Sequence, residues 1–191
     1  MKILGLDSSG IVASVAIVED ENLIAEYTVN YKKTHSQTLL PMLDELVKMT
    51  ELDLDTIDAI AVAAGPGSFT GLRIGSATAK GLGLALKKPL VEIPTVDALA
   101  YNLYDSRALI CPIMDARRSQ VYTGIYRFQE HKLVTVEAQM AVPMAEMIEK
   151  LNARGEEVVF LGDGVPVFGK MIQENLKVPY SFAPAHVNKQ R

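Results

Sequence analysis

The sequence predicts an α/β protein built from two copies of one unit. A strand pattern that ends in an aspartate occurs twice, at Asp7 and at Asp115. A buried strand pattern that runs into a Gly-x-Gly turn also occurs twice, at Gly65 and at Gly162, and the second copy is slightly compressed. Because strands and helices follow in the same order in both copies, we expect two lobes that face each other across a cleft, each with a mixed five-stranded sheet and flanking helices.

The first copy reads as three strands, a helix and a fourth strand. The second strand and its neighbours alternate apolar and polar residues, which fits an antiparallel hairpin or meander. The fourth strand is apolar without alternation, as expected of a strand that is covered on both faces. Apolar residues of the helix recur at spacings of three and four, so they share one face. The predicted elements are the strands Ile3–Asp7, Val12–Val18 and Leu23–Tyr31, the helix Leu39–Met49 and the strand Ala59–Ala64.

The second copy repeats this order beyond a seam near Tyr104–Arg107. A short helix, Val96–Leu103 with Thr95 as its N-cap, precedes the seam. We therefore expect an N-terminal lobe of residues 1–104 and a C-terminal lobe of residues 105–191. The predicted elements of the second copy are the strands Leu109–Met114, Gln120–Phe128 and Leu133–Glu137, the helix Pro143–Asn152 and the strand Glu157–Leu161.

Composition limits the classes of protein that fit the chain. Its 191 residues are 49% hydrophobic and 22% charged, which is typical of a soluble globular protein. The net charge of −4 argues against a protein that binds nucleic acid by itself, because phosphate contacts need clustered Lys and Arg. The sequence has neither a membrane-spanning run nor a signal-peptide pattern, so we expect a cytoplasmic protein. The single cysteine, Cys111, lies in an apolar strand and is expected to be buried and inert.

The strongest local signal is a glycine-rich helix that follows the turn at Gly65. Ser68 or Thr70 is expected to cap it. Each interior glycine costs about 0.8–1 kcal/mol relative to alanine, so close approach by another element must offset the cost. Three interpretations remain open: packing on the protein's own sheet, contact with a partner subunit, and anion binding at the helix N-terminus. The stripe of small residues, spaced four apart, consists of Gly71, Gly75, Ala79 and Gly83, and Gly81 is a further glycine off this stripe.

The two strand-end aspartates are candidates for a metal–nucleotide site. Both are followed by polar turns, and carboxylates at strand ends suit a metal–phosphate complex. The alternative is that each aspartate accepts backbone hydrogen bonds and fixes its own hairpin. The three histidines lie far apart in sequence, so a transition-metal site is not expected. No cofactor is expected either. The candidate nucleotide-binding residues are Asp7, Ser8, Ser9, Asp115, Gly162 and Gly164.

Four segments in this order, Ile3–Ser9, His35–Pro41, Gly65–Gly75 and Asp115–Arg118, resemble the TsaB (YeaZ) family. The resemblance runs from Met1 to about Gly164. It implies the actin-like/sugar kinase-like (ASKHA) fold, which is built from the duplicated unit described above. It also implies a non-catalytic subunit in the synthesis of N6-threonylcarbamoyladenosine, the modified base beside the tRNA anticodon. Relatives of this family usually continue further, so a final helix is expected to be missing after Val187.

The same resemblance implies partners. They are a catalytic TsaD-type threonylcarbamoyltransferase and a TsaE-type ATPase; tRNA is reached only through the complex, and the chain is expected to form a homodimer when alone. The chain lacks the metal-binding His-x-x-x-His motif of the catalytic paralogue, which argues against the glycoprotease label. The remaining alternatives are an ATPase or small kinase that uses Asp7 and Asp115, and a metallopeptidase. The contact helices carried over by resemblance are Ser36–Met49 and Thr70–Leu86, and the expected interface residues are Leu39, Leu43, Gly71, Arg73, Gly75, Ala79 and Gly83.

Overall fold

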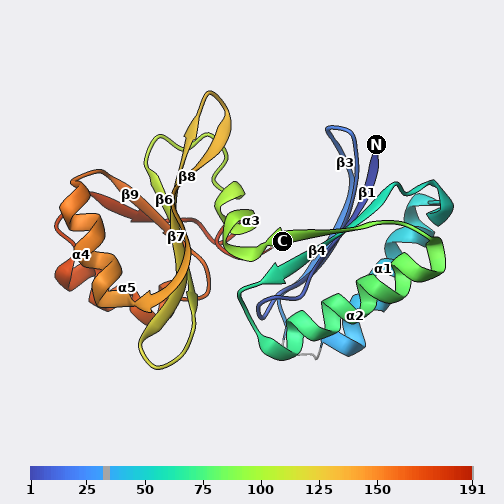
Figure 1. Ribbon diagram of the computed structural model, residues 1–191, viewed down its shortest axis with the longest axis horizontal. Helices are drawn as coiled ribbons and strands as arrows, with labels where there is room; N and C mark the ends of the chain where they lie inside the picture. Colours follow the sequence, from blue (N-terminus) through green and yellow to red (C-terminus); the bar gives the residue numbers. More distant parts are fainter. Residues whose placement is uncertain (32–34, 191) are drawn as a thin grey trace. The chain divides into compact units, whose positions relative to one another are not determined.

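A computed structural model describes residues 1–31 and 35–190 of the chain (Figure 1). Its first sheet has the strand order β3-β2-β1-β4-β5. The central strand β1 runs antiparallel to β2 and parallel to β4, so the sheet is mixed. Two helices, α1 and α2, pack against this sheet and against each other. The elements are β1 (Lys2–Asp7), β2 (Ala13–Glu19), β3 (Asn22–Val29), α1 (His35–Thr50), the 3-10 helix η1 (Leu54–Thr56), β4 (Ala59–Gly65), α2 (Phe69–Leu86) and β5 (Leu90–Pro94).

The second sheet repeats the topology of the first. Its order β8-β7-β6-β9-β10 places β6 where β1 lies in the first sheet, antiparallel to β7 and parallel to β9. This equivalence confirms the predicted duplication and the predicted α/β class with mixed five-stranded sheets. The elements are α3 (Thr95–Tyr101), β6 (Leu109–Asp115), β7 (Gln120–Gln129), β8 (Lys132–Pro143), α4 (Met144–Arg154), β9 (Val158–Leu161), α5 (Val165–Asn175) and β10 (Tyr180–Phe182).

The chain divides into two compact units. Unit 1 comprises Met1–Thr95 together with Gln190, and unit 2 comprises Val96–Lys189. Each unit contains one of the two sheets with its helices. Within residues 1–31 and 35–190, no helix is both long and apolar enough to cross a membrane.

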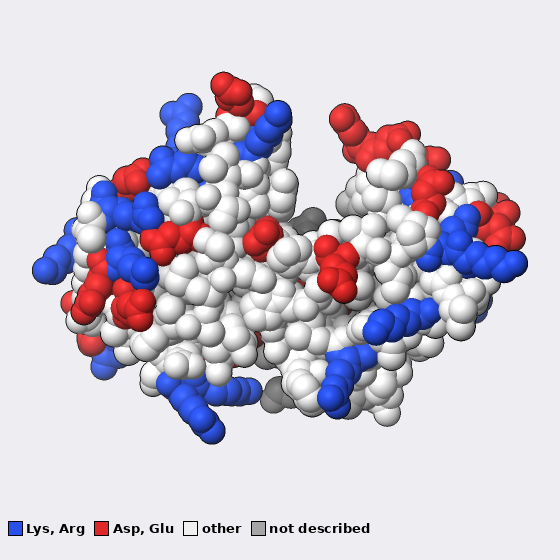
Figure 2. Space-filling view, in the orientation of Figure 1, with Lys and Arg blue, Asp and Glu red and all other residues white. Residues whose placement is uncertain are grey.

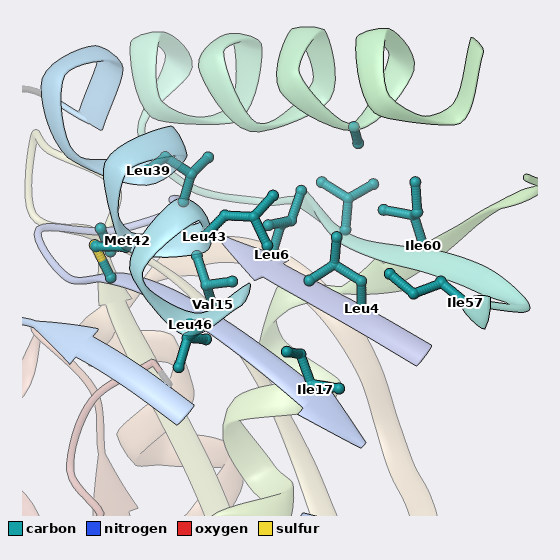
Figure 3. Close-up of a cluster of buried hydrophobic side chains, with 13 residues drawn as sticks. Leu4, Leu6, Val15, Ile17, Leu39, Met42, Leu43, Leu46, Ile57 and Ile60 are labelled. Carbon is teal, nitrogen blue, oxygen red and sulfur yellow. The ribbon is translucent and has the colours of Figure 1, made fainter. Parts of the chain in front are cut away.

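The core of unit 1 lies between the sheet and its two helices (Figure 3). Leu39 and Leu43 of α1 point toward Leu6 and Val15 of the sheet, as Figure 3 shows. Leu39, Leu43 and Leu6 are at most 4% exposed. The three- and four-residue spacing that predicted one apolar helix face therefore corresponds to the face that the sheet covers.

Helix α2 begins at a side-chain cap. The Ser68 hydroxyl accepts a hydrogen bond from the N–H of Gly71 at 3.3 Å, which confirms one of the two predicted caps. The predicted cap of the next helix is wrong. Thr95 is itself the first residue of α3, and its hydroxyl accepts a hydrogen bond from the N–H of Gly65 at 3.1 Å. This buried threonine thus closes the end of β4 instead of capping α3.

Unit 2 has two apolar clusters around its sheet, one that includes α4 and α5 and one that includes α3. Cys111 in β6 is fully buried, and burial raises the pKa of its thiol to about 12, in agreement with the predicted inert cysteine. Tyr126 of β7 is also fully buried, and its hydroxyl donates a hydrogen bond of 2.6 Å to Asp97 of α3. The hydrogen bond satisfies a hydroxyl that would otherwise be desolvated without a partner.

Candidate functional site

The glycine stripe of α2 faces the protein's own chain. Gly71, Gly75, Ala79 and Gly83 are all buried. A β-carbon at Gly71 would overlap the carbonyl oxygen of Ser8, and one at Gly75 would lie 2.5 Å from the Ser8 hydroxyl. At the far end of the helix, a β-carbon at Gly83 would lie 2.8 Å from the side chain of Leu90. Small residues are needed here because α2 rests directly on the β1 turn and on β5.

These contacts correct the predicted interface residues. A partner cannot reach Gly71, Gly75, Ala79 or Gly83, since the sheet and the β1 turn already cover them. Leu39 and Leu43 are corrected for the same reason, because both belong to the core of unit 1. Of the seven predicted positions only Arg73 is exposed, and its guanidinium lies 3.9 Å from the ring centroid of Phe69.

A second row of small residues lies on the exposed side of α2. Ala77, Gly81 and Ala85 are again four residues apart, and all three are exposed. Nothing lies within 4 Å of the position that a β-carbon at Gly81 would occupy. The adjacent Leu84 is 84% exposed, so a large apolar side chain stands beside this row of small residues.

Helix α1 has two exposed apolar residues of its own, Leu40 and Met49, which lie nine residues apart and therefore on opposite sides of the helix. Leu40 is 51% exposed and Met49 is 77% exposed. Both helices pack on the same sheet and contact each other, as Figure 1 shows. We call the exposed side of α2 the exposed helix face; its small and apolar members are Ala77, Gly81, Leu84 and Ala85.

The Asp7 turn is buried under the start of α2. The Asp7 carboxylate accepts the N–H of Ser9 at 2.7 Å, and the Ser8 hydroxyl donates to the carbonyl of Gly71 at 2.9 Å. Ser9 in turn accepts the N–H of Ser68 through its carbonyl at 2.7 Å. Burial raises the pKa of Asp7, and the hydrogen bonds from Ser9 only partly oppose that effect. With Ser8 and Ser9 at most 2% exposed, this turn holds α2 in place.

Asp115 occupies the equivalent position in unit 2 and makes the equivalent hydrogen bond. Its carboxylate accepts the N–H of Arg117 at 2.9 Å and pairs with the Arg117 guanidinium at 3.3 Å. The Asp115 N–H donates to Asp163 at 3.2 Å, and burial raises the pKa of Asp163. Each aspartate thus accepts the N–H two residues ahead, which is the turn-fixing arrangement that the sequence left as an alternative.

The other candidate nucleotide-binding residues of unit 2 are two glycines against β6. β-Carbons at Gly162 and Gly164 would overlap or crowd the carbonyl of Ile113. The N–H of Gly164 donates to that same carbonyl at 2.9 Å. These glycines allow the backbone to approach β6 closely, and they lie in the same unit as Asp115.

Metal ligands do not gather in the part of the chain that the structure describes: it has no group of three or more His, Cys, Asp or Glu residues suited to a metal ion. His35 is instead tied to the Asp7 turn, with its Nε2 atom 2.8 Å from the carbonyl oxygen of Gly10. His131 pairs with Asp105 at 3.0 Å on the surface of unit 2.

Sequence reasoning missed the exposed helix face. It identified helix α2 by its glycines and left open whether the stripe Gly71, Gly75, Ala79 and Gly83 packs on the protein's own sheet or on a partner, but it assigned the expected interface residues of α2 mainly to that stripe. Gly81 was the available signal, because it lies off that stripe and, in the part of the chain that the structure describes, no neighbouring element requires a glycine there.

Comparison with known proteins identifies a matching family model, similar sequences and a solved structure with the same fold. Residues 22–191 match the family model described as "TsaD: tRNA N6-adenosine threonylcarbamoyltransferase". The chain is 36% identical to the tRNA threonylcarbamoyladenosine biosynthesis protein TsaB of Bacillus subtilis, over 92% of this chain and 77% of the relative. It is 30% identical to the protein of the same name from Escherichia coli, over 86% of this chain and 72% of the relative. The solved structure of YeaZ from Pseudomonas aeruginosa superposes with a TM-score of 0.82 at 26% identity, covering 98% of this chain and 86% of that one.

Proposed function

The chain belongs to the TsaB family of tRNA threonylcarbamoyladenosine biosynthesis proteins, and we propose that it is a non-catalytic subunit that binds and activates a TsaD-type threonylcarbamoyltransferase. The exposed helix face is the contact surface for the transferase. A separate catalytic subunit carries the chemistry, and this chain stabilises the active form of that subunit.

The observation that carries the proposal is the exposed small and apolar surface on α2. Leu84 exposes most of its surface, and Gly81, three residues before it on the same helix, leaves bare backbone beside it. Apolar surface of this kind, on helices that present small residues, suits close packing with helices of another protein. These residues destabilise the free chain, because a glycine weakens the helix and exposed apolar side chains remain in contact with water. A partner that packs on them offsets this loss of stability.

The aspartate turns support a subunit without chemistry of its own. Asp7 and Asp115 both use their carboxylates to fix backbone turns. Ser8 and Ser9 are buried under α2, so a phosphate group has no path to their hydroxyls. This arrangement favours the subunit over the ATPase or kinase that the two aspartates suggested from sequence.

The remaining partners follow from the assembly role. The TsaE-type ATPase joins the complex of this chain and the transferase, and tRNA is bound by the complex, in keeping with the net charge of −4 on this chain. Without the transferase, the exposed helix face pairs with a second copy of the chain. A role in tRNA modification supports a cytoplasmic location.

Reconstituted tRNA modification tests the proposal. The transferase is assayed for formation of the modified adenosine with and without this chain, and then with Leu84→Glu. A charge forced into an apolar contact costs about 1–3 kcal/mol, so the variant should weaken assembly about 10–100-fold. Val167→Glu is the matched control, because Val167 is also exposed but lies on α5 of unit 2.

The two variants separate the possible results. Loss of modification and of co-purification with Leu84→Glu, but not with Val167→Glu, supports contact through α2. A transferase that is equally active without this chain contradicts the activating role. Sedimentation of the chain alone adds a further check, since Leu84→Glu should then be monomeric.

A further inference from the structure

Unit 1 has a second unoccupied surface, on the other side of α2 from α1. A groove of about 420 Å³ lies between the first half of α2 and strands β4 and β5. Its floor is apolar, with Val62, Ala63 and Ala64 of β4 and Leu72 of α2. We call it the β5 groove; it belongs wholly to unit 1 and differs from the exposed helix face, although Ala77 borders both.

Strand β5 forms the outer wall of the groove and is the edge of its sheet. Four of its five residues are exposed, and Leu90 and Val91 are 38% and 43% exposed. An exposed edge strand presents unpaired N–H and C=O groups to any extended chain that approaches it. Within the described residues, no further strand pairs with β5 on this side.

The hydrogen-bond register shows which peptide groups of β5 are free. Ile60 pairs with Leu90, and the Ile60 N–H donates to the carbonyl of Pro89. In a parallel pair of strands, a residue forms its hydrogen bonds with the residues before and after its partner, and not with the partner itself. Because the partner of Ile60 is Leu90, the N–H of Val91 points toward β4. The N–H groups of Leu90 and Glu92 therefore point away from β4, toward the open edge.

The charges at the groove favour an acidic ligand. Arg73 and Lys80 of α2 line it, opposite Glu92 of β5. Within residues 1–31 and 35–190, neither cation forms an ion pair, and Arg73 only stacks over Phe69. Figure 2 shows basic side chains over α2 and acidic side chains beside β5, with uncharged surface between them. With Glu92 counted, the two cations still leave the lining of the groove with a net positive charge on a chain of net charge −4, which favours a carboxylate placed on the α2 side.

We propose that the β5 groove binds an extended, carboxylate-bearing segment of a partner polypeptide, which adds as a strand to the edge of β5. The Leu90 and Glu92 N–H groups bond the main chain of the segment. The side chains of the segment on the α2 side of the sheet extend over β5 toward Leu72, and a carboxylate among them faces Arg73 and Lys80. A groove between an edge strand and a helix is the site at which several peptide-binding domains accept an added strand. The inference goes beyond assembly with the transferase and does not depend on it.

A displayed library of random heptapeptides tests the proposal on the full chain. Peptides are selected on the wild-type protein and measured against two variants of one residue. Glu92→Pro deletes the outward N–H while Val91 and Ile93 keep their bonds to β4, and edge strands tolerate proline. Glu92→Ala removes the same side chain but keeps the N–H. Thermal melts of both variants show whether the fold is intact.

The expected result is a set of peptides that combine Val, Ile or Thr with Asp or Glu. Glu92→Pro should weaken their binding about tenfold, whereas Glu92→Ala should leave it unchanged or strengthen it, since a repelling charge is lost. Added salt should weaken binding to the wild type. If Glu92→Pro does not fold, the double variant Arg73→Glu with Lys80→Glu replaces it. This variant should reject the acidic peptides and accept the same peptides with Lys in place of Glu.

Three results would overturn the proposal. One is that no selected peptide binds the wild type more tightly than it binds the charge-reversed variant Arg73→Glu with Lys80→Glu. Another is selection of amphipathic helical peptides that bind Glu92→Pro as well as wild type. The third is a change from dimer to monomer on Glu92→Pro in sedimentation, which would make a second copy the ligand. Reconstituted tRNA modification by the wild-type chain is measured separately, so failure of the assembly role and failure of strand addition give different results.

Discussion

Substitution of Gly75 by alanine tests most directly how α2 is held on unit 1. An alanine β-carbon at this position would lie 2.5 Å from the Ser8 hydroxyl and 3.7 Å from a methyl group of Val62. The Ser8 hydroxyl is buried and donates to the carbonyl of Gly71 at 2.9 Å. The new methyl group therefore displaces a buried hydroxyl from the carbonyl that it bonds. The same substitution at Gly81 meets nothing within 4 Å and serves as the control in the same helix.

The magnitude follows from three contributions. Alanine in place of a helical glycine stabilises the folded state by about 1 kcal/mol. Overpacking against Ser8 and Val62 costs about 1–3 kcal/mol, and the displaced buried hydrogen bond costs about 1–3 kcal/mol. Gly75→Ala should thus lower the free energy of unfolding by about 1–5 kcal/mol, whereas Gly81→Ala should raise it by about 0.5–1 kcal/mol. For a chain of this size, each kcal/mol corresponds to about 2–4 °C in melting temperature.

Urea unfolding followed by far-ultraviolet circular dichroism gives both values. The double variant Ser8→Ala with Gly75→Ala provides a further check, because it removes the displaced hydroxyl and should recover part of the lost stability. Equal stability of Gly75→Ala and Gly81→Ala would falsify the assignment of this stripe to the protein's own packing. Weaker transferase binding by a fully stable Gly75→Ala would point in the same direction.

Three further predictions concern buried polar groups. Burial raises the pKa of Asp7 above its ordinary 3.8, so the ionised carboxylate opposes folding. The stability of the protein therefore falls as the pH rises through the raised pKa. In urea unfolding, Asp7→Asn should be more stable than the wild type at neutral pH and should show no advantage below pH 3.8. Tyr126→Phe should lower the free energy of unfolding by about 1–3 kcal/mol in the same assay, because Asp97 loses the hydrogen bond of 2.6 Å that the Tyr126 hydroxyl donates to it. Cys111 should resist an aromatic disulfide reagent in the folded protein and react on addition of urea, and fast labelling without urea would contradict its burial.

Much of the fold could be predicted because the signals repeat. The aspartate that ends β1 and the one that ends β6 mark the same position in both units, and the Gly-x-Gly turns follow β4 and β9. Runs such as Ala59–Ala64 have no polar residue, so only a covered strand fits them. The repeat reaches the level of single hydrogen bonds, since Asp7 and Asp115 each accept the N–H two residues ahead.

Sequence reasoning did not place η1, β5, α5 or β10. Helix α5 has an apolar face with Phe168 and Ile172 and was simply missed, whereas the strands lack a strong pattern of their own. Strand β5 is five residues long and exposes most of them, so its sequence lacks the apolar run that marked β4. β10 has only three residues, and its pairing with β9 decides its structure. β8 extends to Pro143, well beyond the predicted Glu137, because its pairing with β7 continues past two register shifts.

Helix α2 shows why spacing alone could not decide which small residues face a partner. A four-residue period states that Gly71, Gly75, Ala79 and Gly83 share a face, but Ala77, Gly81 and Ala85 share another by the same rule. The identity of the neighbour separates the two rows. Ser8 and Leu90 occupy the space beside the first row, so its glycines are required by the fold of unit 1. Gly81 has no such neighbour among the described residues, so the fold of unit 1 does not require a glycine there, and the proposed contact with the transferase would offset its cost of about 1 kcal/mol.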